Sequence, residues 1–383
     1  MAQHFELGRQ ALQTRLQERV AAGAPLVLAG PPGAGKTTLL HRTARALEAA
    51  GWRTVYLDLM GAASSPERFV SAALQALPAD RFGALLARAT DLRRTLASGR
   101  AAAAGAVQAL FALWASLDEA GGGPVALLLD EATEIRSLNY FAGLREAHAA
   151  MGSALVSRPR GTLLATSFPT LARRLWPGLE VLELGPVAAD ELEPALRRDG
   201  VAGDAAALAR ASYGWPRYLR ILARRAATGD ALASAWAEEM APGGALESAC
   251  RHTYESLLLR SRGYGMSKAL LATVAAEEGL NLTALVARLG RTPGAVRDYL
   301  GWLLGVDALR SVRKRYFYVD GMLRWWVFLH ARGTPPDEAE LRAAAERVLA
   351  SPADAPPADP PVPAPVATAP TATLRRDPLM EID

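Results

Sequence analysis

Eight residues near the start of the sequence have the types and spacing of a phosphate-binding loop. They are Gly30, Pro31, Pro32, Gly33, Ala34, Gly35, Lys36 and Thr37, and Thr38 follows them. In such a loop the glycines let backbone N–H groups surround phosphate oxygens, and the following helix adds the positive end of its dipole. Lys36 supplies a charge for the β- and γ-phosphates, and the Thr37 hydroxyl supplies a ligand for Mg²⁺. The pattern predicts a site for ATP and Mg²⁺.

Two adjacent acids lie downstream of this loop. Asp130 is the last residue of the apolar run 125–130, and Glu131 comes directly after it. An acid at the carboxyl end of a buried strand lies where an open parallel sheet presents its ligands. We expect Asp130 to hold Mg²⁺ and Glu131 to polarise the attacking water as a general base. A surface acid pair is the alternative interpretation.

A second polar strand end follows at Thr166 and Ser167. A hydroxyl at this position could orient the attacking water or contact the γ-phosphate, and Thr166 is our catalytic candidate. The alternative is that these side chains cap the next helix.

The elements that must position these residues alternate along the chain. Short apolar runs predict strands over 25–30, 53–59, 125–130, 162–167 and 180–184. Helical periodicity between them, as in 37–51, predicts an α/β fold with a doubly wound parallel sheet. The strand signal then stops, and short helices follow over 188–240. The predicted domains are a P-loop core (1–186), a helical lid (187–250), a winged-helix domain (251–332), a helix (333–350) and a disordered Pro/Ala-rich tail (351–383).

Positive charge is concentrated near the C-terminal end. Residues 251–332 contain 13 Lys and Arg against 6 Asp and Glu, a net charge of +7, which leaves −3 for the rest of a chain whose total is +4. A basic module on a slightly acidic body suggests a polyanion as its partner. A solvated arginine-rich surface would give the same numbers.

Within this basic region, 282–289 and 293–304 have helix-turn-helix proportions. Thr292 and Pro293 suit the N-cap and first position of the second helix. A strand pair around 310–319 would then form a wing. The residues that we expect to face the phosphates of double-stranded DNA are Arg291, Arg297, Arg310, Arg313, Lys314 and Arg315. The competing interpretation is a module that binds protein, because the aromatic runs 316–318 and 325–328 are typical of core or docking surface.

The order of phosphate loop, LLLDE, polar strand end, helical lid and winged helix resembles that of AAA+ ATPases. The likeness covers about residues 5–330 and is greatest to the archaeal-type and initiator-like ATPases and to the related STAND group. It implies an ATP-hydrolysing switch in a DNA-associated assembly. A signalling ATPase whose winged helix binds protein, or a transposition or segregation helper, is the alternative.

The resemblance also assigns roles to four arginines. The segment Phe5-Glu6-Leu7-Gly8-Arg9 is similar to the one that holds adenine in this family, although Gln10 stands where an acid is usual. Arg173 and Arg174 lie where the family places an arginine finger that acts on a neighbouring subunit, which implies an ATP-dependent homo-oligomer. Arg217, in Gly214-Trp215-Pro216-Arg217, lies near the position of a sensor arginine for the γ-phosphate, with Arg220 as its rival.

Two further features limit the class of protein. Cys250 is the only cysteine, which excludes an intramolecular disulfide framework and a multi-cysteine metal site. The first residues lack an apolar segment of the signal-peptide type, and no run of about 18 apolar residues occurs. We therefore expect a cytoplasmic location and no membrane partner. The tail could also serve as a docking peptide for a protein.

Overall fold

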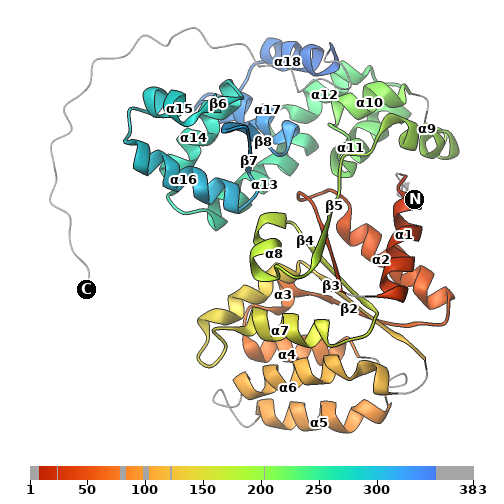
Figure 1. Cartoon of the computed structure of the whole chain (residues 1–383). Helices are drawn as coiled ribbons and strands as arrows, with labels where there is room; N and C mark the ends of the chain where they lie inside the picture. Colours follow the sequence, from red (N-terminus) through yellow and green to blue (C-terminus); the bar gives the residue numbers. More distant parts are fainter. Residues whose placement is uncertain are drawn as a thin grey trace.

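The computed structural model describes residues 8–23, 25–77, 83–97, 103–120, 123–201 and 203–350. The predicted disordered tail and residues 5–7 of the adenine segment lie outside the described residues. In Figure 1 an α/β core occupies the lower half, and helices from the C-terminal half of the chain lie above it. No helix within the described ranges is long and apolar enough to cross a membrane.

A five-stranded parallel sheet in the order β2-β3-β4-β1-β5 forms the centre of the core. Its strands are β1 (Leu26–Ala29), β2 (Arg53–Asp58), β3 (Val125–Asp130), β4 (Thr162–Thr166) and β5 (Glu180–Glu183). All five strands predicted from the sequence are thus confirmed. β3 is buried along its whole length because helices cover both faces of the sheet.

Alternating side chains of the strands belong to two separate hydrophobic clusters, one on each face of the sheet. Leu28, Leu128 and Leu163 pack on one face against α1 (Gln10–Ala22) and α2 (Lys36–Ala49). Val27, Leu127 and Leu164 pack on the other face. The elements that cover this second face include α3 (Leu59–Ala62), α4 (Pro66–Gln75), α5 (Gly83–Ala97), α6 (Ala103–Ala115), η2 (Leu117–Ala120), η3 (Ala132–Tyr140), α7 (Ala147–Val156) and α8 (Pro169–Leu175). The sheet is therefore doubly wound, as predicted.

Four short helices follow the last strand and form the lid region. They are α9 (Ala189–Arg198), α10 (Ala205–Ala211), α11 (Pro216–Ala227) and α12 (Leu232–Met240). The helix α18 (Glu338–Ala350), predicted over 333–350, returns from the C-terminal end of the described chain and packs against α10 and α12. The long helix α13 (Ala245–Arg260) continues from the lid towards the last part of the fold.

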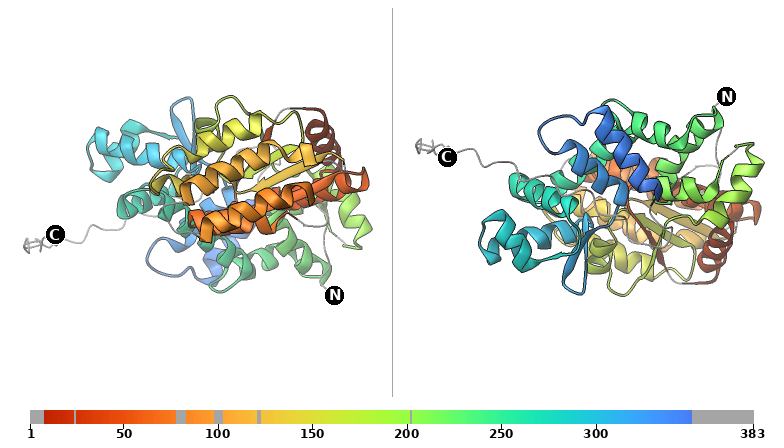
Figure 2. Two further views of the ribbon diagram at one scale, coloured as in Figure 1. Left: turned by 90° about the horizontal axis from the view of Figure 1, so that it is seen from below. Right: turned by 90° about the horizontal axis from the view of Figure 1, so that it is seen from above.

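The C-terminal module, residues 264–330, combines helices with a small antiparallel sheet. Its helices are α14 (Tyr264–Ala276), α15 (Leu282–Leu289), α16 (Pro293–Gly305) and α17 (Gly321–His330). Its strands β6 (Leu280–Asn281), β7 (Leu309–Val312) and β8 (Arg315–Tyr318) pair in the order β6-β8-β7. Seen from above in Figure 2, the module and the lid lie side by side over the sheet.

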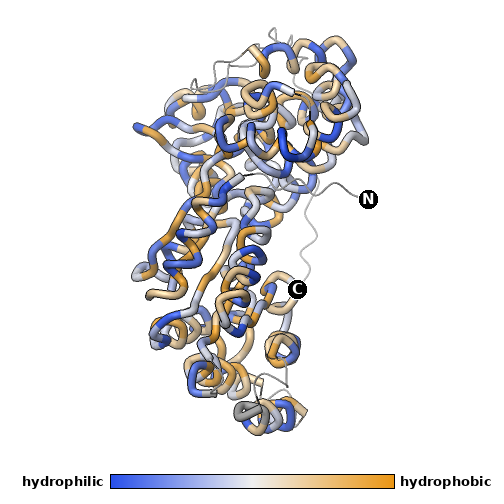
Figure 3. The backbone as a smooth tube through the Cα atoms, turned by 90° about the vertical axis from the view of Figure 1, so that its right-hand side faces the viewer, coloured by the Kyte–Doolittle hydropathy of each residue, from blue (hydrophilic) through white to orange (hydrophobic). Residues whose placement is uncertain are grey.

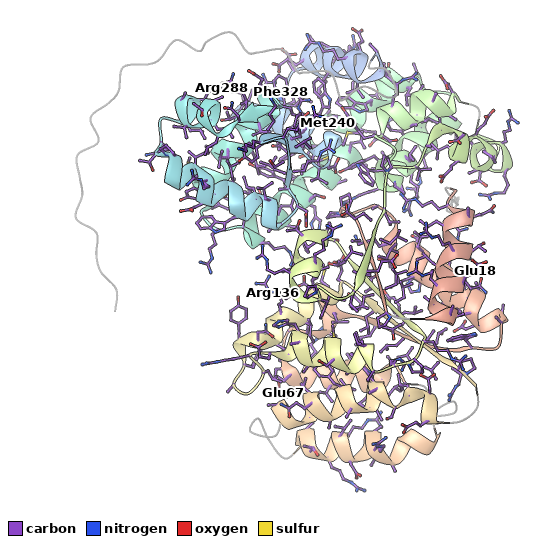
Figure 4. All side chains as sticks on the ribbon, in the orientation of Figure 1. Glu18, Glu67, Arg136, Met240, Arg288 and Phe328 are labelled. Carbon is purple, nitrogen blue, oxygen red and sulfur yellow. The ribbon has the colours of Figure 1, made fainter. Side chains whose placement is uncertain are left out.

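The aromatic run of α17 belongs to the core of this half of the molecule. Trp325, Trp326 and Phe328 are buried, so the structure does not offer them as a docking surface. Figure 4 labels Phe328 and Met240 within the packed upper half. A buried hydrogen bond from Tyr218 to Asp320 and a partly buried one from Trp325 to Tyr213 join the module to the lid. Figure 3 shows polar and apolar residues alternating along the helices, as expected of helices with one packed face.

Candidate functional site

The phosphate loop connects the carboxyl end of β1 to the first turn of α2. Gly33 and Gly35 have φ angles of +86° and +92°, which residues with a Cβ rarely adopt. A Cβ on Gly33 would also lie 2.7 Å from Cβ of Arg217. The lid helix α11 therefore packs directly on the loop, and the Arg217 backbone N–H donates to the Gly33 carbonyl at 3.2 Å.

Lys36 lies at the centre of the site. Its side chain is 4 % exposed, and Nζ donates to the Gly30 carbonyl and to Ser167 Oγ, each at 2.9 Å. Glu131 Oε1 lies 3.7 Å from the same nitrogen. Burial lowers the pKa of Lys36, and the charges of Glu131 and Asp130 oppose that shift. The ammonium group is thus held in a fixed place among acceptors.

Glu131 is anchored to the end of the neighbouring strand β4. Its carboxylate accepts hydrogen bonds from Ser167 Oγ at 2.6 Å and from the Ser167 backbone N–H at 3.0 Å. The backbone of Glu131 has a φ of +44°, in the left-handed region. Non-glycine residues in this conformation cost about 1–3 kcal/mol and cluster at functional sites. In this conformation the carboxylate lies beside Lys36 and Ser167.

Thr37 and Asp130 form the second hydrogen-bonded pair of the site. Thr37 Oγ1 donates to Asp130 Oδ2 at 2.6 Å, and the Tyr56 hydroxyl donates to the same oxygen at 3.1 Å. A hydroxyl beside a carboxylate is a donor set that suits Mg²⁺, which uses few protein ligands and completes its shell with phosphates and water. The described residues contain no group of three or more His, Cys, Asp or Glu side chains that could hold a metal ion.

The strand end of β4 contributes Ser167 and not the predicted Thr166. Thr166 is buried, its Oγ1 lies 2.8 Å from Thr133 Oγ1, and it accepts a hydrogen bond from the Phe168 backbone N–H. Thr166 therefore supports the turn after the strand, while Ser167 contacts Lys36 and Glu131. Successive side chains of a strand point to opposite faces, so a shift of one residue reverses the assignment.

A cavity of about 600 Å³ opens over the phosphate loop. The core lines it with Lys36, Thr37, Glu131, Glu134 and Ser167, and helices α11 and α13 add Arg220, Thr253 and Arg260. This cavity has the composition of a phosphate site, with cations, hydroxyls and carboxylates from five segments of the chain.

The structure brings Arg220 to this cavity, whereas the predicted sensor Arg217 does not line it. The Arg217 guanidinium donates to Thr253 Oγ1 at 3.2 Å, and its aliphatic part packs under Gly33. Arg220 lies one helical turn later, and burial lowers its pKa. The periodicity of a helix is visible in the sequence, but the face that meets the loop depends on how the helix docks.

Arg9, Arg173 and Arg174 lie around the site without entering this cavity. Arg9 donates to the Ala34 carbonyl at 2.7 Å and to the Gly185 carbonyl at 2.6 Å, and burial lowers its pKa. It thereby holds the back of the loop. Arg173 forms an ion pair with Glu183, and Arg174 is exposed on α8.

The six predicted DNA contacts gather on the C-terminal module, and all are exposed. Arg315 donates to the Gly279 carbonyl at 2.8 Å. The side chains of the other five form no hydrogen bond or ion pair within the described part of the chain: Arg291, Arg297, Arg310, Arg313 and Lys314. We call these six residues the basic face. By contrast Arg288 of the same module, labelled in Figure 4, is paired with Glu277.

Comparison with known proteins identifies the first part of the chain. Residues 7–163 match the family model of the AAA ATPase domain. No curated protein matches the sequence. The chain therefore contains an AAA ATPase domain, and the prediction of an ATPase that binds a nucleotide is confirmed.

One solved structure supports the fold at low sequence identity, and two others are similar with lower TM-scores. The Walker-type ATPase PABY2304 of Pyrococcus abyssi aligns with a TM-score of 0.63 at 15 % identity, over 84 % of this chain and 95 % of that one. The ORC2 protein of Aeropyrum pernix has a TM-score of 0.42 at 17 % identity, over 89 % and 92 %. The RuvB Holliday junction branch migration motor of Thermotoga maritima has a TM-score of 0.36 at 19 % identity, over 81 % and 92 %. The roles of the lid and the C-terminal module remain predictions.

Proposed function

We propose that this AAA ATPase is a molecular switch that binds ATP–Mg²⁺ between its core and lid and acts in a DNA-associated assembly. The observation that carries the proposal is the network joining Lys36, Glu131 and Ser167 beside the Thr37–Asp130 pair. It joins the phosphate loop to the carboxyl ends of β3 and β4, where an open parallel sheet binds its ligands.

In the proposed reaction Lys36 holds the β- and γ-phosphates. Thr37 and Asp130 would hold Mg²⁺, which would neutralise phosphate charge. Glu131 orients a water and accepts its proton as the water oxygen bonds to the γ-phosphorus. The bond from that phosphorus to the bridging oxygen breaks, and ADP leaves with the electron pair. Ser167 positions the Glu131 carboxylate.

The hydrogen bonds of Glu131 support slow, switch-like hydrolysis. Its carboxylate accepts two hydrogen bonds from Ser167 and faces Lys36 at 3.7 Å. While these contacts are in place, both carboxylate oxygens of Glu131 are occupied by Ser167 and Lys36 and do not face a water. Glu131 must therefore exchange these partners before it can accept a proton.

We further propose that the C-terminal module is a winged helix that binds double-stranded DNA through its basic face. Helices α14, α15 and α16 and the β7–β8 hairpin supply its parts. Among the described residues, five of the six cations of the basic face have no side-chain partner, so their charge is available to phosphates. Base-reading side chains are scarce there, which favours recognition of the DNA backbone.

The hairpin tip provides independent support. Arg313 and Lys314 form its turn, with φ angles of +50° and +63°. Two-residue turns of this kind favour Asn and Gly, because other residues are strained at positive φ. Two long cationic side chains at strained positions therefore support a role for their charge in binding phosphates.

We also propose the expected homo-oligomer, in which the exposed Arg174 can reach a neighbouring subunit while Arg173 is paired with Glu183.

A salt series on the intact protein tests the DNA part of the proposal. We expect binding to random-sequence duplex DNA whose affinity falls steeply between about 50 and 200 mM salt, and ATP to change that affinity. A wild-type protein that ignores duplex DNA at about 50 mM salt would instead support the alternative, in which the winged helix binds a protein.

A further inference from the structure

Arg260 was not among the candidate residues, yet its side chain lines the same cavity as Lys36 and Thr37. It is the last residue of α13, and the C-terminal module begins four positions later at Tyr264. Arg260 thus lies between the phosphate loop and the module that carries the basic face.

Two contacts place Arg260 beside the catalytic network. Its guanidinium donates to Glu134 Oε1 at 2.7 Å, and its Cζ lies 4.7 Å from the centre of the Phe168 ring. Glu134 comes three residues after Glu131, and Phe168 comes directly after Ser167. Both supports of the arginine therefore belong to the segments that hold the catalytic carboxylate.

The hydrogen bond to Glu134 leaves most donors of Arg260 uncommitted. A guanidinium has five N–H donors in a planar fork that suits phosphate oxygens. One of these N–H groups donates to Glu134. The guanidinium lies over the face of the Phe168 ring, a contact that does not use the remaining N–H groups. With a side chain 33 % exposed, Arg260 is at the mouth of the cavity and accessible to a ligand inside it.

From these contacts we infer that Arg260 is a phosphate-binding arginine that α13 supplies within the same chain, and that it binds the γ-phosphate of ATP. Glu134 holds the guanidinium in place without ATP, and the γ-phosphate replaces Glu134 when ATP binds. The inference rests on the proposed ATP site and extends it, because a contact at the end of α13 would report the γ-phosphate to the C-terminal module. ADP lacks this phosphate and leaves Arg260 on Glu134.

The affinities of Arg260→Ala for fluorescent ATP and ADP analogues, measured with Mg²⁺ on the full chain, test this inference. We expect ATP binding to weaken by at least about tenfold, as for a lost charge-assisted hydrogen bond, and ADP binding to change less than about twofold. Arg260→Lys should fall between wild type and Arg260→Ala, because it keeps the charge but not the fork. Arg262→Ala is the matched control, since Arg262 is exposed two residues later and should change neither affinity.

Glu134→Gln gives a second measurement that does not depend on losing an arginine. Because it removes the competing carboxylate, ATP binding should tighten while ADP binding stays constant. Equal losses of ATP and ADP binding in a folded Arg260→Ala protein would mean a structural role and overturn the inference, as would no loss of either. These results differ from failure of the ATP site itself, in which wild-type protein would bind neither nucleotide and Lys36→Ala would change nothing.

Discussion

Two regions of this molecule present cations to phosphates, and they do so in opposite ways. In the phosphate loop Lys36 is 4 % exposed and donates to the Gly30 carbonyl and to Ser167. On the basic face of the C-terminal module, Arg291, Arg297 and Arg310 are exposed, and their side chains have no partner in the part of the chain that the structure describes. One region has a single charge in a fixed geometry, and the other has several charges without fixed partners.

The difference teaches what each region can recognise. A buried cation loses its hydration when the protein folds, so a ligand finds it already oriented and only weakly screened by salt. An exposed cation keeps its hydration and its counterions, so its binding to DNA depends on released ions and falls with salt. The first region can discriminate one phosphate group, and the second can only detect a dense polyanion.

The largest expected effect comes from Lys36→Ala. It removes the buried charge on the β- and γ-phosphates and should abolish ATP binding and turnover, while DNA affinity without ATP stays at the wild-type value. Nucleotide titration and phosphate release measure the first effect, and fluorescence anisotropy of labelled DNA measures the second. Lys268→Ala is a matched control, because Lys268 lies in the module against Tyr264. Normal hydrolysis by folded Lys36→Ala protein would refute the site.

Glu131→Gln should slow single-turnover hydrolysis by about 10²–10⁴-fold and leave ATP bound, because the amide cannot accept the proton of the water. The control is Glu146→Gln, since Glu146 has a side chain that is 81 % exposed. A rate within about threefold of wild type would show that Glu131 is not the general base.

Changing Arg310, Arg313, Lys314 and Arg315 to Ala should weaken DNA binding for every sequence alike, by up to about tenfold per lost phosphate contact near 0.1 M salt. The salt dependence should flatten by up to about 0.9 per contact, and ATP binding should not change. The matched control removes four exposed arginines from the core: Arg45, Arg68, Arg93 and Arg145. Equal losses in both variants would mean that only net charge matters, and the basic face would lose its special role.

The smallest effect concerns Asp307, through which the module contacts the core. Asp307 accepts hydrogen bonds from the Thr170 backbone N–H and hydroxyl at the start of α8. Burial raises the pKa of Asp307 from 3.8 to about 6; the Thr170 hydrogen bonds and Arg173 oppose that shift, and Glu183 adds to it. Between about pH 4 and pH 6 the folded state therefore holds a proton that the unfolded state has lost. The contribution of Asp307 to the free energy of unfolding therefore falls as pH rises through this window.

Asp307→Asn should remove this pH dependence, because the amide is neutral and retains groups that can bond to Thr170. The free energy of unfolding of the variant minus that of wild type should therefore increase from pH 4 to pH 7. The increase should be no more than about 3 kcal/mol, which corresponds to roughly two pKa units. Urea unfolding of both proteins at several pH values measures the difference. A constant difference from pH 4 to pH 7 would contradict the raised pKa.

Local patterns in the sequence were sufficient for the sheet and for the phosphate loop. Each strand is a short apolar run, and Gly33 and Gly35 mark a backbone that residues with a Cβ rarely adopt. The bounds of α15 and α16 were also predictable within about one residue, and Thr292 and Pro293 mark the start of α16 whatever surrounds it. Such signals depend on a few neighbours along the chain.

Tertiary structure alone decided which side chains meet. Ser167 reaches Lys36 across 131 residues and Thr166 does not, because the phase of β4 is set by packing. Arg220 and Arg260 line the cavity and Arg217 does not, because the docking of α11 and α13 selects their faces. The basic face is available because, across the described ranges, no acid from another segment pairs with five of its cations. Partners of this kind come from distant segments, and a sequence records only which residues are neighbours along the chain.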